Sequence, residues 1–139
     1  MSKSKSQAIW KGTLKDGAGE MNFTDYSGPY TFASRFEDGK ETNPEELIGA
    51  AHAGCYSMFL SALISEHNLD PKQIKTVATV HLDKDDIGPV ISTIELNCEV
   101  ECTGLSEEKF NELAQAAKEK CPVSRLVAAA DIRLNAKLL

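Results

Sequence analysis

The segment from Leu47 to Ile64 carries no formally charged residue and is almost long enough to span a bilayer. It nevertheless contains His52, two glycines and two serines, two glutamates precede it, and it lacks flanking Trp or Lys/Arg anchors. These features favour a helix buried on nearly all sides in a soluble core, so no membrane partner is expected. A chain of 139 residues can supply one such core, which predicts a single domain over residues 1–139.

This helix has clear start and stop signals. Asn43 is a suitable N-cap, Pro44 fits the first helical position, and Glu46 falls at the third. We expect the helix to run from about Pro44 to His67 and to end ahead of Pro71.

Short strands are predicted before this helix. In the first of them, Trp10, Gly12 and Leu14 would lie on one face. Glycine-rich and proline-containing stretches between the strands are typical of turns. The expected strands cover residues 8–14, 20–23 and 30–34, with a turn at residues 27–29 before the third.

Two long strands, two helices and a last strand are predicted after the central helix. Ser106 caps an amphipathic helix in which Phe110, Leu113, Ala114 and Ala117 form an apolar stripe at helical spacing. A Cys-Pro step then ends this helix and starts a shorter one. The remaining expected elements are strands over residues 73–83, 89–102 and 131–138 and a short helix over residues 122–129.

The predicted element order is β-β-β-α-β-β-α-α-β. Because the strands come mostly in antiparallel hairpin-like pairs, the fold class is α+β rather than a doubly wound sheet. No Rossmann or P-loop glycine fingerprint occurs, and no cofactor is expected. A formal net charge of −6 argues against nucleic acid as a partner. No secretory signal is recognised, so we expect a cytoplasmic protein without structural disulfides.

Two of the four cysteines lie in one predicted strand. Cys98 and Cys102 alternate inward with Ile94, Leu96 and Val100, so they face the core. Strand geometry separates them by roughly 13 Å, which is too far for a disulfide or for binding one zinc ion together. We interpret both as small buried hydrophobic residues.

The other two cysteines lie on or next to helices. Cys55 is in mid-helix with His52 one turn earlier, so it is a buried thiol, a nucleophile beside a histidine, or half of a metal site. No second His or Cys stands nearby to complete a zinc set. Cys121 precedes Pro122 at or near an N-cap, where backbone N–H groups can stabilise a thiolate, although a structural role is also open.

Two motifs together resemble a known family. The sequence TNPEELIGAAHAGCYSMFLS, followed by CPVS at residues 121–124, is similar to the OsmC/Ohr family of organic hydroperoxide reductases. The stretch RFEDGKETNPEELIGAAHAGC, at residues 35–55, resembles the OsmC branch in particular. The length, the element order and the final strand fit as well, so the resemblance covers essentially the whole chain.

The resemblance implies a fold, an activity and four site residues. The fold would be an intertwined homodimer in which antiparallel sheets from both chains enclose two central helices. The activity would be thiol-dependent reduction of organic hydroperoxides to alcohols. Cys55 matches the family's peroxidatic cysteine and Cys121 its resolving cysteine, while Arg35 and Glu45 match the arginine and glutamate that assist.

The implied chemistry makes separate demands on these residues. A thiol reduces a peroxide as a thiolate, and a cysteine in mid-helix needs a nearby cation to ionise at neutral pH. Arg35 is the best candidate, because its charge is permanent and its planar fork can hold sulfur and oxygen together. Glu45 would orient Arg35 through a bidentate ion pair. Glu45 lies roughly 15 Å along the helix from Cys55, so either Arg35 bridges part of that gap or the other subunit supplies Glu45.

After the attack, Cys55 would become a sulfenic acid, and Cys121 would convert it into a Cys55–Cys121 disulfide. An external dithiol would reduce this disulfide, and lipoyl-type dithiols, thioredoxin-like proteins and small thiols all fit that role. Met58 and Phe59 are expected to pack in the core. The competing interpretation is a redox-silent thiol sensor or small-ligand-binding protein on the same fold. The intact set of four site residues favours the enzyme.

Overall fold

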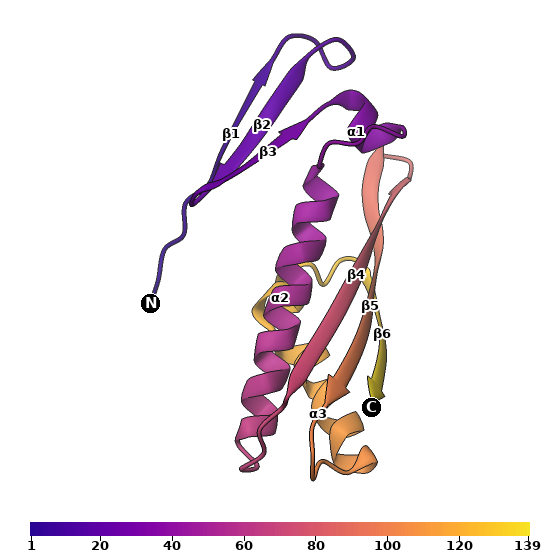
Figure 1. Cartoon of the computed structure of the whole chain (residues 1–139). Coiled ribbons are helices and arrows are strands. Elements are labelled where there is room, and N and C mark those ends of the chain that lie inside the picture. Colours follow the sequence, from indigo (N-terminus) through magenta and orange to yellow (C-terminus); the bar gives the residue numbers. More distant parts are fainter. The chain divides into compact units, whose positions relative to one another are not determined.

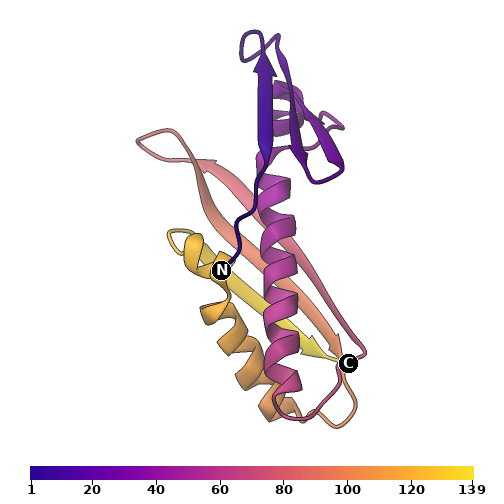
Figure 2. The same cartoon turned by 90° about the vertical axis from the view of Figure 1, so that its left-hand side faces the viewer.

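The computed structural model describes residues 1–139 and contains two compact units, Met1–Leu47 and Ile48–Leu139. Figure 1 and Figure 2 show the elements of both units from two directions. The first unit holds a small sheet and a short helix. The second unit holds a larger sheet and the helices that cover it.

The strands of the first unit are β1 (Gln7–Lys11), β2 (Ala18–Phe23) and β3 (Tyr26–Tyr30). They form an antiparallel sheet in the order β1-β2-β3. β1 ends earlier than predicted, because Gly12 adopts a φ of +96° and breaks the extended backbone.

The turn of the second hairpin lies at Thr24 and Asp25, where Thr24 has a φ of 51°. The sequence prediction of a turn at residues 27–29 is wrong, because these residues pair with β2. Pro29 fits there because β3 is an edge strand, and an edge strand leaves one row of N–H groups without a partner in the sheet.

The predicted strand over residues 30–34 is also wrong beyond Tyr30, because β3 ends there and the short helix α1 (Phe32–Phe36) follows. The Ser34 N–H donates to Thr31 Oγ1 at 3.1 Å, and the Thr31 N–H donates to Ser34 Oγ at 2.9 Å. This capping box favours a helix over a strand. Gly39 packs closely on α1, since a Cβ at this position would lie 2.5 Å from the Ser34 nitrogen.

The long apolar helix is α2 (Pro44–Ser65), which begins where the sequence predicts. The Glu46 N–H donates to Asn43 Oδ1 at 2.8 Å, which confirms Asn43 as the N-cap. The helix ends at Ser65 rather than at His67, and Asn68 then adopts a φ of 59°.

By length and composition α2 could cross a membrane, with a mean hydropathy of 1.5. Its inner face is nevertheless packed in protein, since His52, Tyr56, Leu60 and Ile64 are fully buried. The interpretation of α2 as a core helix is therefore correct for this face. Only 28% of the apolar window is buried, so the expectation of burial on nearly all sides is wrong within one chain.

The outer face of α2 is apolar and exposed. Met58 is 78% exposed, so the expectation that it packs in the core is wrong. Phe59 does pack against the core. A Cβ added to Gly54 would meet no atom within 4 Å. The second unit has one sheet, which covers only one side of the helix. Small exposed residues fill most of this outer face: Ala50, Ala51, Gly54 and Ala62.

The sheet of the second unit consists of β4 (Gln73–Lys84), β5 (Pro89–Glu101) and β6 (Asp131–Leu138), in that order. β4 and β5 form the predicted antiparallel hairpin. β6 pairs with β5 in parallel, so the prediction of antiparallel sheets is wrong for this pair. A parallel neighbour needs a long crossover, and α3 (Glu107–Lys120) and α4 (Pro122–Leu126) supply it.

The core of the second unit includes side chains from the sheet and from the helices α2 and α3. Alternate residues of β5 are buried there, and Cys98 and Cys102 are among the buried residues, as predicted. The predicted stripe of α3, from Phe110 to Ala117, is buried in the same core. The Tyr56 hydroxyl donates to the Ala114 carbonyl at 3.1 Å, which ties α2 to α3.

Candidate functional site

Cys121 lies at the junction of α3 and α4 and is fully buried. Its backbone N–H donates to the Ala117 carbonyl at 3.0 Å and closes α3. Its Sγ accepts the backbone N–H of Ser124 at 3.3 Å, so the sulfur is the N-cap of α4, as the sequence predicts. Pro122 follows at the start of α4, where its missing N–H costs nothing. The junction therefore holds the sulfur in a defined position.

Cys55 lies in the middle of α2 and is half-buried. Burial raises the pKa of its thiol above the ordinary value, the backbone N–H of Val123 lowers it, and the neighbouring Cys121 thiol raises it. Both neighbours belong to the α3–α4 junction, so the fold brings the two cysteines together from distant parts of the sequence. All four cysteines are free thiols.

This environment keeps the Cys55 thiol protonated. A higher pKa means a smaller thiolate fraction at neutral pH, and none of the groups that shift the pKa of Cys55 is a cation. The predicted role of Cys55 as a nucleophile therefore requires a positive charge that its own surroundings in the second unit do not supply.

Arg35 on α1 forms the predicted ion pair with Glu45 at the start of α2, and both residues belong to the first unit. Nη2 donates to Oε1 at 2.6 Å, and Nε lies 3.2 Å from both carboxylate oxygens. The guanidinium carbon lies 5.4 Å from the centroid of the Phe36 ring, in cation–π contact. Nη1 makes no hydrogen bond, so one edge of the fork is free for a ligand.

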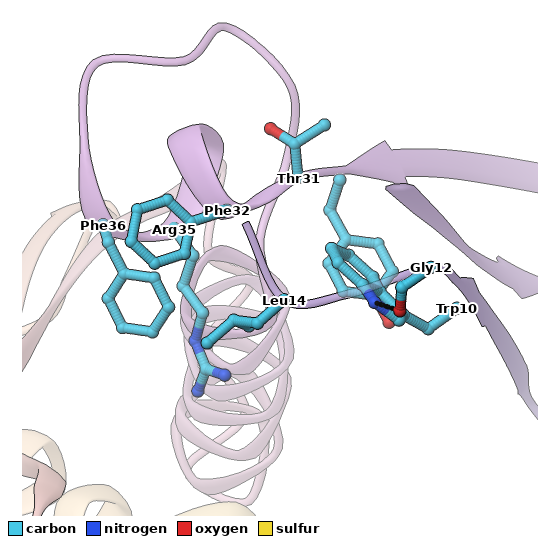
Figure 3. A pocket seen from close by; sticks show the side chains of 8 residues that line it. Trp10, Gly12, Leu14, Thr31, Phe32, Arg35 and Phe36 are labelled. Carbon is cyan, nitrogen blue, oxygen red and sulfur yellow. Dashed lines mark hydrogen bonds between the residues drawn. The ribbon is translucent and has the colours of Figure 1, made fainter. Parts of the chain in front are cut away.

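A pocket of about 400 Å³ in the first unit is lined in part by Arg35 (Figure 3). The rings of Trp10 and Tyr30 lie 5.2 Å apart in its wall. Gly19 permits this approach, because a Cβ there would come within 2.6 Å of Trp10 and 2.7 Å of Tyr30. The apolar lining is completed by Leu14, Phe32 and Phe36. An apolar wall with one cation suits a small apolar molecule that carries a polar group.

The four predicted site residues thus form two pairs. Arg35 and Glu45 are joined by an ion pair within the first unit. Cys55 and Cys121 are neighbours in the second unit. The catalytic roles that the sequence analysis assigns to the four residues stay predictions.

His52 makes no hydrogen bond to Cys55, although the two residues are one helical turn apart. Its Nε2 lies 2.7 Å from Ser124 Oγ, and the Cys121 thiol donates to the same oxygen at 3.2 Å. Ser124 was not predicted from the sequence, although its place three residues after a capping cysteine was a usable signal. Against the metal alternative, no group of three or more His, Cys, Asp or Glu side chains is arranged to hold a metal ion.

Comparisons with known proteins identify the family of this chain. The family model described as OsmC-like protein matches residues 37–137. The chain is 45% identical to peroxiredoxin OsmC of Escherichia coli, over 96% of this chain and 95% of that protein. It is 29% identical to organic hydroperoxide resistance protein-like 1 of Staphylococcus epidermidis, over 73% of this chain and 74% of that one.

A solved structure agrees with the fold. The crystal structure of an OsmC-like protein from Mycoplasma pneumoniae superposes with a TM-score of 0.78 at 14% identity, covering 99% of this chain and 98% of that one. The shared α+β fold, the family model and the full-length identity lead to one conclusion: the chain belongs to the OsmC family, with α2 as the core helix of a soluble protein.

Proposed function

We propose that this protein is a thiol peroxidase that reduces organic hydroperoxides to alcohols in the cytoplasm. The observation that carries the proposal is the neighbouring pair of thiols, Cys55 and Cys121, in a chain that is similar to peroxiredoxin OsmC over its full length. The resistance protein of Staphylococcus epidermidis, whose name refers to organic hydroperoxides, supports the substrate class.

In the first step, the thiolate of Cys55 attacks the terminal oxygen of the hydroperoxide. A sulfur–oxygen bond forms, the oxygen–oxygen bond breaks, and the alkoxide takes a proton and leaves as the alcohol. Arg35 favours the thiolate and stabilises the charge that develops on the leaving oxygen. Glu45 holds the guanidinium by two of its nitrogens, which leaves Nη1 free to donate to the leaving oxygen.

In the second step, Cys121 attacks the sulfenic acid of Cys55, which gives a Cys55–Cys121 disulfide and water. This step protects Cys55 from over-oxidation. An external dithiol, either lipoyl-type or protein-borne, then reduces the disulfide by thiol–disulfide exchange.

The aromatic pocket beside Arg35 is our candidate for the site that holds the organic group of the substrate. Its volume of about 400 Å³ lies within the usual range for small-molecule sites. Its apolar wall gives no advantage to hydrogen peroxide, which has no apolar part to bury. This pocket is therefore expected to favour organic hydroperoxides.

A second copy of this chain is the proposed partner of the exposed face of α2. That face carries no charge from Leu47 to Ile64, and its small residues, such as Ala50 and Gly54, would let two helices approach closely. Sedimentation analysis is expected to give a dimer, and Gly54→Glu is expected to dissociate it. A parent protein that sediments as a monomer at micromolar concentration would contradict this part of the proposal.

The test of the enzymatic reaction is an anaerobic titration of free thiols with cumene hydroperoxide and then with hydrogen peroxide. We expect the organic peroxide to consume two of the four thiols per chain and peptide mapping to find the Cys55–Cys121 disulfide. With excess dithiothreitol the protein should turn over repeatedly. A sensor would instead be oxidised once and would not sustain turnover.

Mixed dimers decide which chain completes the site. Alone, an Arg35→Ala chain is expected to be about 100-fold to 1000-fold less active than the parent, and a Cys55→Ser chain is expected to be inactive. If Arg35 serves the Cys55 of the other subunit, a mixed dimer regains one complete site. If Arg35 serves its own chain, the mixed dimer gains no activity over the Arg35→Ala chain.

A further inference from the structure

Three buried polar side chains between α2 and α4 form a hydrogen-bonded chain, of which the steps above use only Cys121. The Cys121 thiol donates to Ser124 Oγ at 3.2 Å, and Ser124 Oγ lies 2.7 Å from His52 Nε2. Cys121 and His52 are fully buried and Ser124 is 3% exposed. A buried polar chain in an apolar core is costly unless it is satisfied, so its presence requires an explanation.

The direction of the two hydrogen bonds follows from the protons available. Burial lowers the pKa of His52, so the ring is neutral and carries one proton. The Cys121 thiol donates to Ser124 Oγ, which leaves the single serine proton to point at His52 Nε2. Nε2 must then accept, and the imidazole proton lies on Nδ1. Both bonds therefore run from the thiol toward the imidazole.

The far side of the ring argues against a purely structural role for His52. Nδ1 is buried and has no hydrogen-bond partner. An unpaired polar atom destabilises the folded state, and an apolar side chain would fill this place without that penalty. A histidine that is retained with one nitrogen unpaired and the other aimed at Ser124 points to proton transfer.

We propose that Ser124 and His52 form a proton relay for the resolving thiol, with Ser124 contacting the reacting sulfur and His52 acting through Ser124 as a positioning residue. This inference rests on the proposed function. Cys121 passes its proton to Ser124 Oγ while Ser124 passes its own proton to His52 Nε2. The relay leaves a thiolate on Cys121, and the Ser124 backbone N–H, 3.3 Å from the sulfur, stabilises it.

The step balances without a further reagent. A lone pair of the Cys121 sulfur forms the S–S bond, and the S–O bond of the Cys55 sulfenic acid breaks with its electron pair on oxygen. The hydroxide takes a proton from solvent and becomes water, and His52 returns its proton to solvent. The sum is thiol plus sulfenic acid giving disulfide plus water.

Other titratable groups lie close to Cys121, lie close to Tyr56 beside it, or line a groove together with Ser124. None of them makes a hydrogen bond to His52 or to the Ser124 side chain, except Cys121 itself. A groove of about 540 Å³ in which Ser124 takes part also contains four charged side chains. The groups concerned are Cys55 and Tyr56 on α2, Cys98 on β5, Lys118 and Glu119 on α3, Arg125 on α4 and Asp131 on β6.

The kinetic test separates formation of the sulfenic acid from its conversion to the disulfide. Reduced full-length protein is mixed with one equivalent of cumene hydroperoxide, quenched with dimedone at successive times and analysed by mass spectrometry. Ser124→Ala is expected to oxidise Cys55 at the parent rate but to form the disulfide about 100-fold more slowly at neutral pH. This deficit should shrink as the pH rises, because hydroxide then ionises Cys121 directly.

Two matched variants control this result. Ser124→Thr keeps the hydroxyl and is expected to restore most of the disulfide rate. Ser57→Ala removes the Ser57 hydroxyl, which lies on α2 like His52 and is hydrogen-bonded to Thr76, and this variant is expected to change neither step. The relay is refuted if Ser124→Ala forms the disulfide at the parent rate, or if its deficit is the same at every pH.

A second measurement needs no peroxide and so remains decisive if the proposed function fails. Nitrogen-15 NMR of the reduced protein should find His52 neutral, with its proton on Nδ1, and Ser124→Ala should weaken this preference. A proton on Nε2 would overturn the relay, because His52 could then not accept from Ser124. If the parent protein instead forms neither sulfenic acid nor disulfide, the proposed function fails, and the tautomer alone decides the hydrogen-bond direction.

Discussion

The two units of the chain supply opposite kinds of chemistry. In the first unit, the only buried side chains are polar, Ser34 and Glu45, and Arg35 is held by hydrogen bonds and an ion pair. In the second unit, Cys55 and Cys121 belong to a large apolar core. The first unit thus offers a permanent charge, and the second offers two neighbouring thiols, of which burial raises the pKa of Cys55. A thiol peroxidase needs both a thiol and a positive charge that favours its thiolate.

Removing the nucleophile tests the second unit and should have the largest effect. Cys55→Ser is expected to abolish peroxide reduction, because a hydroxyl does not ionise at neutral pH and does not reduce a peroxide. Cys98→Ser is the matched control, since Cys98 is a buried thiol in the same core. Peroxide consumption by a ferrous–xylenol orange assay measures both. Activity in Cys55→Ser at the parent rate would assign the nucleophile elsewhere.

Removing the cation tests the first unit. Arg35→Ala is expected to lower kcat/KM by about 100-fold to 1000-fold, the range for losing one preorganised charge donor at a reacting oxygen. Glu45→Gln should cost less, because the guanidinium remains but is less firmly oriented. Thiolate absorbance near 240 nm against pH provides a second readout. In Arg35→Ala the apparent pKa of Cys55 should rise, and an unchanged titration would separate Arg35 from the thiol.

Stability should divide between the units in the same way as burial. Phe110→Ala in the second unit is expected to lower the free energy of unfolding by about 3–5 kcal/mol, because this ring is fully buried. Phe36→Ala in the first unit, where the residue is 41% exposed, should cost less than about 1 kcal/mol. Urea titration of both variants measures the difference. Equal losses would mean that the first unit is stabilised by contacts outside its own residues.

The smallest expected effect is a loss of stability at alkaline pH. Burial raises the pKa of Cys98 above its ordinary value of 9.0, so the unfolded state loses this proton at lower pH than the folded state. The stabilisation is complete below the ordinary pKa and is lost as the pH rises toward the folded-state pKa. Thermal melts at increasing pH should show a steeper decline for the parent protein than for Cys98→Ala. Parallel curves would mean that Cys98 does not contribute.

Elements with regular patterning were predicted well from the sequence. The stripe on α3, the alternation along β5 and the bounds of β6 depend on burial of neighbouring residues, which periodicity reports directly. At α1 the prediction of a strand was wrong, because hydrogen bonds between Thr31 and Ser34 cap a helix that strand propensity does not predict. The parallel pairing of β6 depends on the crossover and not on any residue within the strand.

In the candidate site, too, the features with a sequence motif were predicted, and a contact between distant residues was not. The resemblance to a known family indicated the two thiols, and it also implied the ion pair of Arg35 with Glu45. Ser124 was not predicted, because its partner His52 is far away in the sequence and only the packing of α4 on α2 brings the two together. The position of Ser124 after the capping cysteine was a local signal, but its contact with His52 has no signature in a single sequence.

Cys121 also has a consequence for how the protein can be altered. The Cys121 sulfur atom caps the N-terminus of α4, and the same atom would form the proposed disulfide with Cys55. Serine is among the best residues at the start of a helix, so Cys121→Ser keeps the architecture of the junction while deleting its redox function. Alanine would delete both at once. Exchange of the Cys121 sulfur for oxygen therefore turns this junction from a reactive site into a purely structural one.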